Sequence, residues 1–469
     1  MEITSAQFKK VASQKLADKK VQAALAHAKG KFVVARAKAI EELDNFEDIR
    51  RAAADVRDHC LANLDQYLEQ WERNATAAGT IVHWVESAEE MNRTVLDIAT
   101  SNHVRKVIKS KSMLGEETGM NEYLERGGID VRETDLGEYI IQQAKEHPSH
   151  IIAPATHKSK DDIATLFAER HQRPRLDDIE ELTHEAREIL RPHFLDADMG
   201  ITGANFLVAE TGSTMIVTNE GNGRMTTTMP RIHVAISSIE KCIPTLEDLS
   251  LLMRLLARSA TGQSISNYLS VTTGPKRDGD SDGPDEFHVI LVDIGRTRVL
   301  GSDLRPALRC IRCGACMNHC PVYQNIGGHA YGWVYPGPIG SVLTPAYVGL
   351  EKAIDLPNAA TFCNQCGVAC PVKIPLPDLM RKLREKQTER KLTPAGQRVG
   401  MRVWAWLASR PTLYAWATRI VARLGKLAGG KQGLVHRLPL AGAEWTRGRD
   451  LPAPRGKTFR EIYAARNRS

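Results

Sequence analysis

Hydrophobic and polar positions recur along the chain with two different periods, and the change falls near residue 79. Over residues 3–75, apolar residues recur at intervals of three and four among Lys, Arg and Glu, which predicts a helical lead-in over residues 1–75. From Gly79 onward, short β-branched runs alternate with helix-like segments, which predicts a mostly parallel α/β domain over residues 76–300. Strands are expected at 80–85, 106–108, 128–131, 149–153, 204–209, 214–218, 233–236 and 287–292, with a helix over 87–101 opened by Ser87.

Two polar segments follow expected strands and are candidates for a small-molecule site. They are Lys109–Ser112 and Asn219–Arg224. Ligands of such sheets usually lie at the carboxyl ends of the strands, which favours a site there. Both segments are also compatible with a purely structural role, because Asn-Glu-Gly-Asn-Gly is typical of a turn and a lysine-serine stretch is typical of a solvated surface. Asp278–Pro284 is expected to be a polar loop, and His157 and His233 are expected to be ordinary polar or core residues.

Two cysteine runs carry the clearest chemistry, in a segment that we place at residues 301–385. The first holds Cys310, Cys313, Cys316 and Cys320 before Pro321, and the second holds Cys363, Cys366 and Cys370 before Pro371. This spacing is typical of two-cluster iron–sulfur proteins, in which the last cysteine of each run ligates the other cluster. A structural zinc site uses four ligands, which fits seven cysteines poorly. Disulfide frameworks belong to short secreted chains.

Counting back from Pro371 shows that the second run lacks one cysteine. Cys370, Cys366 and Cys363 occupy its fourth, third and second places, so the first place falls on Ala360. If the ligands cross over, cluster 1 is held by Cys310, Cys313, Cys316 and Cys370, and cluster 2 by Cys320, Cys363 and Cys366.

The second cluster therefore lacks one cysteine ligand. It could be a three-iron cluster, a [4Fe–4S] cluster with a non-cysteine ligand, or a cluster with an iron open to solvent, substrate or a partner. We expect both clusters to be [4Fe–4S]. Cys242 could supply the missing thiolate, but Cys60 and Cys242 are most simply small buried hydrophobic residues.

Length and composition place these features in a multi-domain globular protein. A chain of 469 residues, 42% of them hydrophobic, is expected to form two or three domains. No apolar run approaches the roughly 18–20 residues of a membrane span. Because the N-terminal residues show neither an apolar leader nor a twin-arginine start, we expect a cytoplasmic protein.

The basic charge is concentrated in the C-terminal region, which we place at residues 386–469. Residues 381–469 contain 21 Lys and Arg against 5 Asp and Glu, whereas the whole chain has a net charge of +7. Four of the seven tryptophans lie there, interleaved with arginines at helical spacing. An amphipathic helical pair packed on its own core or docked on a subunit is the first expectation. Contact with an anionic membrane surface comes second, and no nucleic-acid partner is expected.

Several motifs resemble those of the lactate utilisation protein B family of LUD-domain iron–sulfur proteins. They are Glu133–Glu138, Pro148–Pro154, Ile201–Phe206, Ala209–Ser213 and Thr218–Arg224, joined to the cysteine runs and to Pro452–Glu461. The resemblance implies a LUD α/β domain of the glucosamine-6-phosphate-isomerase or CoA-transferase type, followed by a helical ferredoxin-like domain. It also implies a three-component L-lactate oxidation system, with a second LUD protein and a cysteine-rich protein as partners. It assigns no catalytic residue.

Three functions are compatible with these features. The first is an electron relay for lactate oxidation, in which Arg309, Arg312 and His319 raise the positive potential around the clusters. The second is a catalytic subunit that uses an open iron as a Lewis acid. The third is a redox sensor or binding module.

Overall fold

The computed structural model describes residues 2–28, 30–266, 268–439, 442–443 and 445–467. The chain divides into two compact units, Met1–Lys386 and Gln387–Ser469. The first unit contains the helical lead-in, the α/β layers and both cysteine runs, and the second contains most of the basic C-terminal region.

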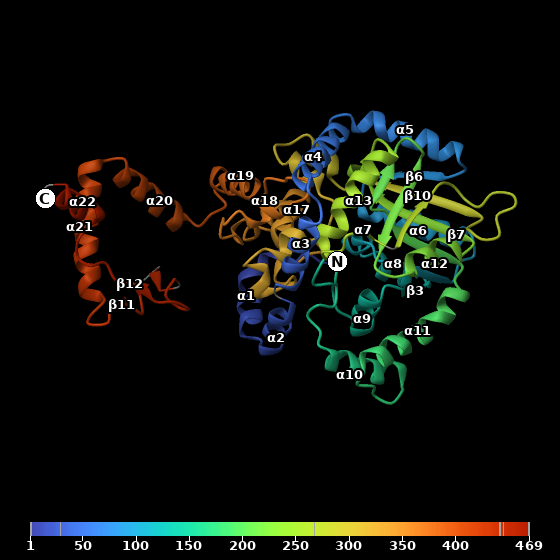
Figure 1. Cartoon of the computed structure of the whole chain (residues 1–469), viewed down its shortest axis with the longest axis horizontal. Coiled ribbons are helices and arrows are strands. Elements are labelled where there is room, and N and C mark those ends of the chain that lie inside the picture. The colour runs from blue at the N-terminus through green and yellow to red at the C-terminus, as the bar shows by residue number, and fades with distance from the viewer. Residues whose placement is uncertain (1, 29, 267, 440–441, 444, 468–469) are drawn as a thin grey trace. The chain divides into compact units, whose positions relative to one another are not determined.

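In the described part of the first unit, six strands form a wholly parallel sheet in the order β1-β10-β7-β4-β2-β3. Its strands β10, β7 and β3 are labelled in Figure 1. Strands β7 and β10 are buried along almost their whole length, because helices cover both faces of a parallel sheet. The expected α/β class is confirmed. The strands are β1 (Ile81–Val85), β2 (Lys106–Lys109), β3 (Asp130–Glu133), β4 (Met199–Gly203), β7 (Ile232–Ser238) and β10 (Glu286–Val292).

Four further strands form a second sheet, which the sequence pattern did not distinguish from the first. Its order is β8-β5-β6-β9, and β6 is antiparallel to both of its neighbours. A parallel pair needs a crossover of a dozen or more residues, whereas only residues 209–212 join β5 to β6, so these two strands form a hairpin. The strands are β5 (Phe206–Val208), β6 (Ser213–Thr218), β8 (Cys242–Ile243) and β9 (Tyr268–Thr272).

The expected strand over residues 149–153 was wrong, and β4 was missed. Residues 149–153 form a loop in which His150 Nδ1 accepts hydrogen bonds from the amides of Ile152 (3.0 Å) and Ala153 (3.2 Å). These bonds occupy backbone donors that a strand would use for its ladder. Strand β4 was overlooked because Gly200 and Gly203 weaken its pattern, although Gly200 is required where a side chain would collide with the carbonyl of Thr226.

Helices pack on both faces of the parallel sheet. Met91 and Val95 of α6 pack with Met120 and Leu124 of α8 on one side, and Trp71 of α5 is buried on the other. The predicted cap is confirmed, because the Ser87 hydroxyl accepts a hydrogen bond from the Glu90 amide (3.1 Å). The helices of the α/β layers are α6 (Ala88–Ser101), α7 (Met113–Thr118), α8 (Met120–Arg126), α9 (Leu136–Ala144), α10 (Lys160–His171), α11 (Ile179–Leu195), α12 (Asn222–Thr228), η2 (Ile239–Lys241) and α13 (Leu246–Ala260).

The lead-in is helical as predicted, and it packs against the cysteine-bearing segment. The Ser5 hydroxyl donates to the carbonyl of Tyr331 (2.8 Å), and α1 packs on α16 and η4. Its elements are η1 (Ser5–Gln7), α1 (Phe8–Ala17), α2 (Lys19–Ala28), α3 (Lys31–Glu41), α4 (Phe46–Ala62) and α5 (Leu64–Ala77).

The segment that carries the cysteines consists mostly of short helical turns. The two short helices that carry a cysteine, α15 and α18, pack against each other. The elements are α14 (Arg296–Leu300), η3 (Arg305–Arg309), α15 (Ala315–Asn318), α16 (Tyr323–Ile326), η4 (His329–Tyr331), α17 (Gly337–Val348), η5 (Leu356–Asn358), α18 (Gln365–Ala369) and α19 (Leu376–Glu389).

The second unit is built around two amphipathic helices. Helix α20 (Ala395–Ala408) contains no buried residue, and Ala422 is the only one in α21 (Pro411–Ala428). The unit also contains β11 (Leu434–Val435), β12 (Leu451–Pro452) and α22 (Phe459–Arg466). Among the described residues, no helix has the length and apolar character that crossing a bilayer requires.

Candidate metal centre and adjoining cavity

The two cysteine runs share one backbone conformation, offset by fifty residues. Arg312 and Phe362 both have positive φ, at 59° and 56°, and Gly314 and Asn364 follow at 75° and 64°. In each run a short helix then carries the third cysteine, and the chain turns before the fourth. This superposition places Cys313 opposite Cys363 and Cys320 opposite Cys370, and it places Ala360 where the first run has Cys310. The register counted from the sequence thus matches the backbone.

Four thiols, which we call the first thiol group, line one small cavity. They come from both runs and are Cys310, Cys313, Cys316 and Cys370. Cys313, Cys316 and Cys370 are buried. Burial and then the neighbouring Cys370 raise the pKa of Cys313, and burial raises the pKa of Cys370 to about 11. Binding of iron requires thiolates, so a cluster would supply the positive charge that this group lacks.

Backbone amides surround the sulfurs of the first group. The Arg312 amide donates to Cys310 Sγ (3.4 Å) and the Ile374 amide donates to Cys370 Sγ (3.3 Å). The Ala315 amide is directed at Cys313. Amide hydrogen bonds to sulfur are one of the means by which proteins tune cluster potentials, so this donor set fits an iron–sulfur cluster.

The second thiol group comprises Cys320, Cys363 and Cys366. Their thiols influence one another electrostatically, since Cys363 raises the pKa of Cys320 and Cys320 raises that of Cys366, in each case after burial. Cys363 is exposed, and so are its neighbours Thr361, Phe362 and Asn364. The first group is therefore enclosed, whereas the second reaches the surface on the side where the cysteine is missing.

The structure places Cys242 away from the second group. Cys242 and Cys60 are fully buried and adjacent, and Cys60 Sγ donates to the carbonyl of Cys242 (3.0 Å). Both belong to the core beneath the parallel sheet, as expected of small hydrophobic residues. Within the described residues, no three His, Cys, Asp or Glu side chains converge as a single metal ion would require. A cubane keeps its thiolates further apart, because each binds a different iron.

Arginines of the lead-in hold the cysteine loops, and nothing in the sequence pattern predicted these contacts. Arg50 donates to the carbonyl of Cys370 (2.7 Å) and to that of Val368 (2.9 Å), and Arg36 donates to that of Ala369 (3.0 Å). These carbonyls end helix α18, where cations are favoured. Arg57, fully buried, donates to the carbonyls of Cys242 (2.8 Å) and Leu308 (3.0 Å). Only long-range packing brings these arginines to the cysteine-bearing segment.

The basic residues predicted beside the clusters have different environments. Arg309 is paired with Asp58 on α4, so its charge is largely compensated. His319 Nδ1 lies 2.9 Å from the carbonyl of Ala315, and burial lowers the pKa of its ring. Arg312 stacks over the ring of Tyr335 (4.6 Å) and lies 3.4 Å from the Glu240 carboxylate.

A buried ion-pair network joins the α/β layers to the cysteine-bearing segment. Arg296 donates two hydrogen bonds to the Glu117 carboxylate (2.7 and 2.6 Å), and the Tyr335 hydroxyl donates to the same carboxylate (2.6 Å). The Arg296 and Glu117 side chains are 1% and 2% exposed. Through Glu240, which lies 3.8 Å from Arg296, this network reaches Arg312.

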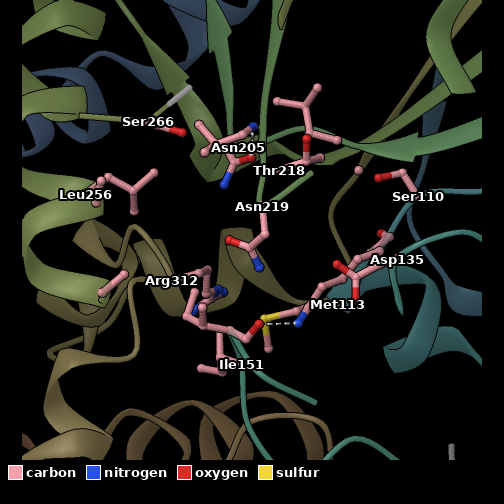
Figure 2. Close-up of a pocket in the computed structure, with 18 of the residues that line it drawn as sticks. Ser110, Met113, Asp135, Ile151, Asn205, Thr218, Asn219, Leu256, Ser266 and Arg312 are labelled. Carbon is pink, nitrogen blue, oxygen red and sulfur yellow. Dashed lines mark hydrogen bonds between the residues drawn. The ribbon is translucent and has the colours of Figure 1, made fainter. Parts of the chain in front are cut away.

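A cavity of about 460 Å³, which we call the large cavity, opens at the carboxyl edge of the parallel sheet (Figure 2). Both candidate segments contribute to it, through Ser110 and Lys111 after β2 and through Asn219 after β6. Asn219 follows β6, which is antiparallel to both of its neighbours in the second sheet, and this corrects the expectation that it ends a parallel strand. Figure 2 shows Arg312 and Ile151 on the side of the cavity opposite Asn205 and Thr218.

Several polar groups of the large cavity have no partner within the described residues. Lys241 is 7% exposed, and its ammonium group forms no hydrogen bond or ion pair there. The Ser110 hydroxyl and Nη1 of Arg312 are buried and likewise lack hydrogen-bond partners in the described chain. Burial and then repulsion by Arg312 lower the pKa of Lys241 to about 7. Lys111, by contrast, donates to the carbonyl of Ile152 (3.1 Å).

An α/β domain joined to seven cysteines in two groups is the architecture of an iron–sulfur protein. Residues 68–292 match the LUD domain family, and residues 306–374 match the 4Fe-4S dicluster domain family. Residues 378–468 match the family described as lactate utilisation protein B, C-terminal. The chain belongs to the lactate utilisation protein B family.

Relatives align over the full chain. Lactate utilization protein B of Shouchella clausii is 44% identical over 100% of this chain and 98% of its own length, and that of Bacillus subtilis is 41% identical with the same coverage. A protein of Escherichia coli K12 named uncharacterized electron transport protein YkgF is 42% identical over 97% of this chain and 96% of its own. A solved DUF162 family protein from Deinococcus radiodurans aligns with 49% of this chain and 98% of its own, at 16% identity and a TM-score of 0.27.

Proposed function

We propose that this protein is the iron–sulfur electron-transfer subunit of an L-lactate oxidation system. The convergence of two cysteine runs into an enclosed group of four thiols and a second group of three that reaches the surface at Cys363 carries the proposal. Clusters in both groups would accept electrons singly and pass them on. The membership of the family and the electron transport protein among its relatives support the same role.

The ligand assignment follows from the two thiol groups. Cys310, Cys313, Cys316 and Cys370 would hold cluster 1, and Cys320, Cys363 and Cys366 would hold cluster 2. We propose that both are [4Fe–4S] clusters and that one iron of cluster 2 lacks a cysteine. The protein's own residues would exclude water from cluster 1 and would stabilise its negative charge through amide donors and through Arg36, which interacts electrostatically with the thiols of Cys313 and Cys370.

The second group would give electrons an entry or exit point where Cys363 reaches the surface. Phe362 is 40% exposed beside Cys363, and the guanidinium of Arg384 lies 4.3 Å from its ring centre. The same exposure makes the open iron accessible to a hydroxy acid, which is the observation in favour of a Lewis-acid catalytic role. The large cavity, however, adjoins the first thiol group and not the open iron of cluster 2, where a Lewis-acid reaction would need the substrate. The relay is therefore the better-supported function.

We further propose that the second unit docks on partner subunits, namely a second LUD protein and a cysteine-rich protein. Trp404, Trp406 and Trp416 are 58%, 52% and 64% exposed, on helices with almost no buried residue. Aromatic and arginine side chains are enriched at protein interfaces. Peripheral contact with a membrane surface is the second possibility for this face, and no nucleic acid is expected. We propose a cytoplasmic location, because thiols that bind clusters must stay reduced.

Reduction by the lactate system tests the relay. Anaerobically purified protein mixed with its two partners and L-lactate should show bleaching of cluster absorption, and protein mixed with L-lactate alone should not. Bleaching and a perturbed cluster 2 spectrum with L-lactate alone would instead support the catalytic role. If α20 is the docking face, Trp404→Ala should slow this reduction. Trp445→Ala, which lies outside α20 and α21, is the matched control and should not slow it.

A further inference from the structure

The large cavity is separated from the first thiol group by a single layer of side chains. Arg312 and Ile151 line both the large cavity and the small cavity among Cys310, Cys313, Cys316 and Cys370. A molecule bound in the large cavity would therefore lie next to cluster 1. No cysteine of either group lines the large cavity itself, so this adjacency rests on the two shared wall residues, which belong to the cavity of the first group.

The polar groups of the cavity favour an anion. Lys241 and Arg312 both line the cavity; Arg312 is paired with Glu240 through Nη2 but its buried Nη1 has no partner in the described chain, and Lys241 forms no hydrogen bond or ion pair with a described residue. A buried ammonium without a partner is costly, and an anionic ligand removes that cost. Asp135 is the single acidic side chain that lines the cavity within the described chain, and its carboxylate is occupied as the cap of α9.

The size and apolar walls of the cavity favour an organic molecule much larger than lactate. A volume of about 460 Å³ lies within the range of roughly 300–1,000 Å³ that is typical of sites for cofactors and drug-sized ligands. Phe32, Leu256 and Ile265 supply apolar surface, and Asn205 and Asn219 supply amides along the strand side (Figure 2). A hydroxy acid alone would leave most of this surface without contacts.

We propose that the large cavity binds an anionic organic electron carrier of about mononucleotide size, with its anionic group on Lys241 and Arg312. This inference rests on the proposed function, because lactate gives up two electrons together whereas each cluster accepts one at a time. Flavins perform both hydride and one-electron chemistry, which makes flavin mononucleotide the probe of choice. A fully reduced flavin bound there would release its two electrons one at a time to cluster 1, which would pass the first to cluster 2 before it accepts the second, and its two protons would go to solvent.

The proposal is tested by titrating the purified holoprotein with flavin mononucleotide and measuring binding from the quenching of flavin fluorescence. Riboflavin, which lacks the phosphate, and adenosine monophosphate, which lacks the redox-active ring, are the comparison ligands. We expect flavin mononucleotide to bind more tightly than both. Equal binding of riboflavin would overturn the anion site, and equal binding of adenosine monophosphate would overturn the electron carrier. Displacement of the flavin by millimolar L-lactate would also overturn it, because the cavity would then be the hydroxy-acid site.

Two cavity variants and one control locate the binding. Lys241→Gln removes a charge-assisted contact and should weaken flavin mononucleotide binding roughly tenfold to a hundredfold. Asn219→Asp adds a negative charge on an exposed loop residue, where folding is little affected, and should also weaken binding. The control, Lys106→Gln, removes an exposed lysine outside the cavity and should not. Unchanged affinity in both cavity variants would place the flavin elsewhere and contradict the proposal.

Iron and sulfide analysis of the same material separates the two proposals. Clusters present without flavin binding would overturn the cavity proposal and leave the relay standing. Absence of clusters would overturn the relay, whereas the flavin titration would still report on the cavity. With clusters present, flavin binding should change the electron paramagnetic resonance (EPR) signal of cluster 1 and leave that of cluster 2 unaltered.

Discussion

Replacement of Arg296 by methionine is expected to weaken the junction between the α/β layers and the cysteine-bearing segment. The variant Arg296→Met keeps the apolar bulk of the side chain and removes the guanidinium. The Glu117 carboxylate, whose side chain is 2% exposed, then keeps only the Tyr335 hydroxyl at 2.6 Å. Glu240 is affected less, because Arg312 remains 3.4 Å away.

The magnitude follows from the burial of this pair. Breaking a buried ion pair by removing one partner costs about 3–5 kcal/mol, since an uncompensated charge is left behind. The double variant Arg296→Met/Glu117→Leu removes both charges of this pair, and Glu240 keeps Arg312 at 3.4 Å. Its remaining cost is the Tyr335 hydroxyl without its acceptor, about 1–3 kcal/mol. The double variant should therefore be more stable than Arg296→Met by about 2 kcal/mol.

Anaerobic urea unfolding provides the assay, with far-ultraviolet circular dichroism and cluster absorption as parallel signals. The two single variants and the double variant form a double-mutant cycle, and a large favourable coupling energy is expected. If the double variant is destabilised by the sum of the two single effects, Arg296 and Glu117 are not coupled and the reasoning is refuted.

Three further results are expected. Burial lowers the pKa of His233 to about 3, below the unfolded value of about 6.5, so the folded state loses about 2 kcal/mol of stability as the pH falls from 7 to 5. His233→Gln should remove that part of the pH dependence of the urea midpoint, and an unchanged dependence of the midpoint on pH would contradict this. Ala360→Cys should supply a fourth thiolate to cluster 2 and suppress the three-iron EPR signal expected from the native protein after mild oxidation; an equal signal in both would argue against the register. Arg36→Gln should shift the potential of cluster 1 to more negative values, on the order of tens of millivolts, in a redox titration, while cluster 2 stays constant.

The local chemistry of the cysteine runs could be predicted from sequence because it is encoded over a few residues. Proline marks the end of each run, so counting back identified Ala360, and the paired positive φ angles of Arg312 and Phe362 show the same register in three dimensions. The candidate loops at Ser110 and Asn219 were also predicted, since polar residues after a strand indicate an edge where ligands bind.

Features set by distant residues could not be predicted. Nothing in the helical pattern around Arg36 and Arg50 distinguishes them from solvent-exposed arginines, yet both hold the end of α18 more than three hundred residues away. The run Ile151-Ile152 was predicted as a strand because it is β-branched. In the structure, the amides of Ile152 and Ala153 donate to His150 Nδ1, and the resulting loop places Ile151 in the walls of both cavities. The unpartnered state of Lys241 likewise depends on the surrounding fold.

The crossover of cysteines between the two clusters is the central claim, and EPR on reduced, anaerobically purified serine variants tests it most directly. Cys370→Ser should alter the same cluster signal as Cys313→Ser, and Cys320→Ser should alter the same signal as Cys363→Ser. If Cys370→Ser instead perturbs the cluster that Cys363→Ser perturbs, each run binds its own cluster and the account is contradicted.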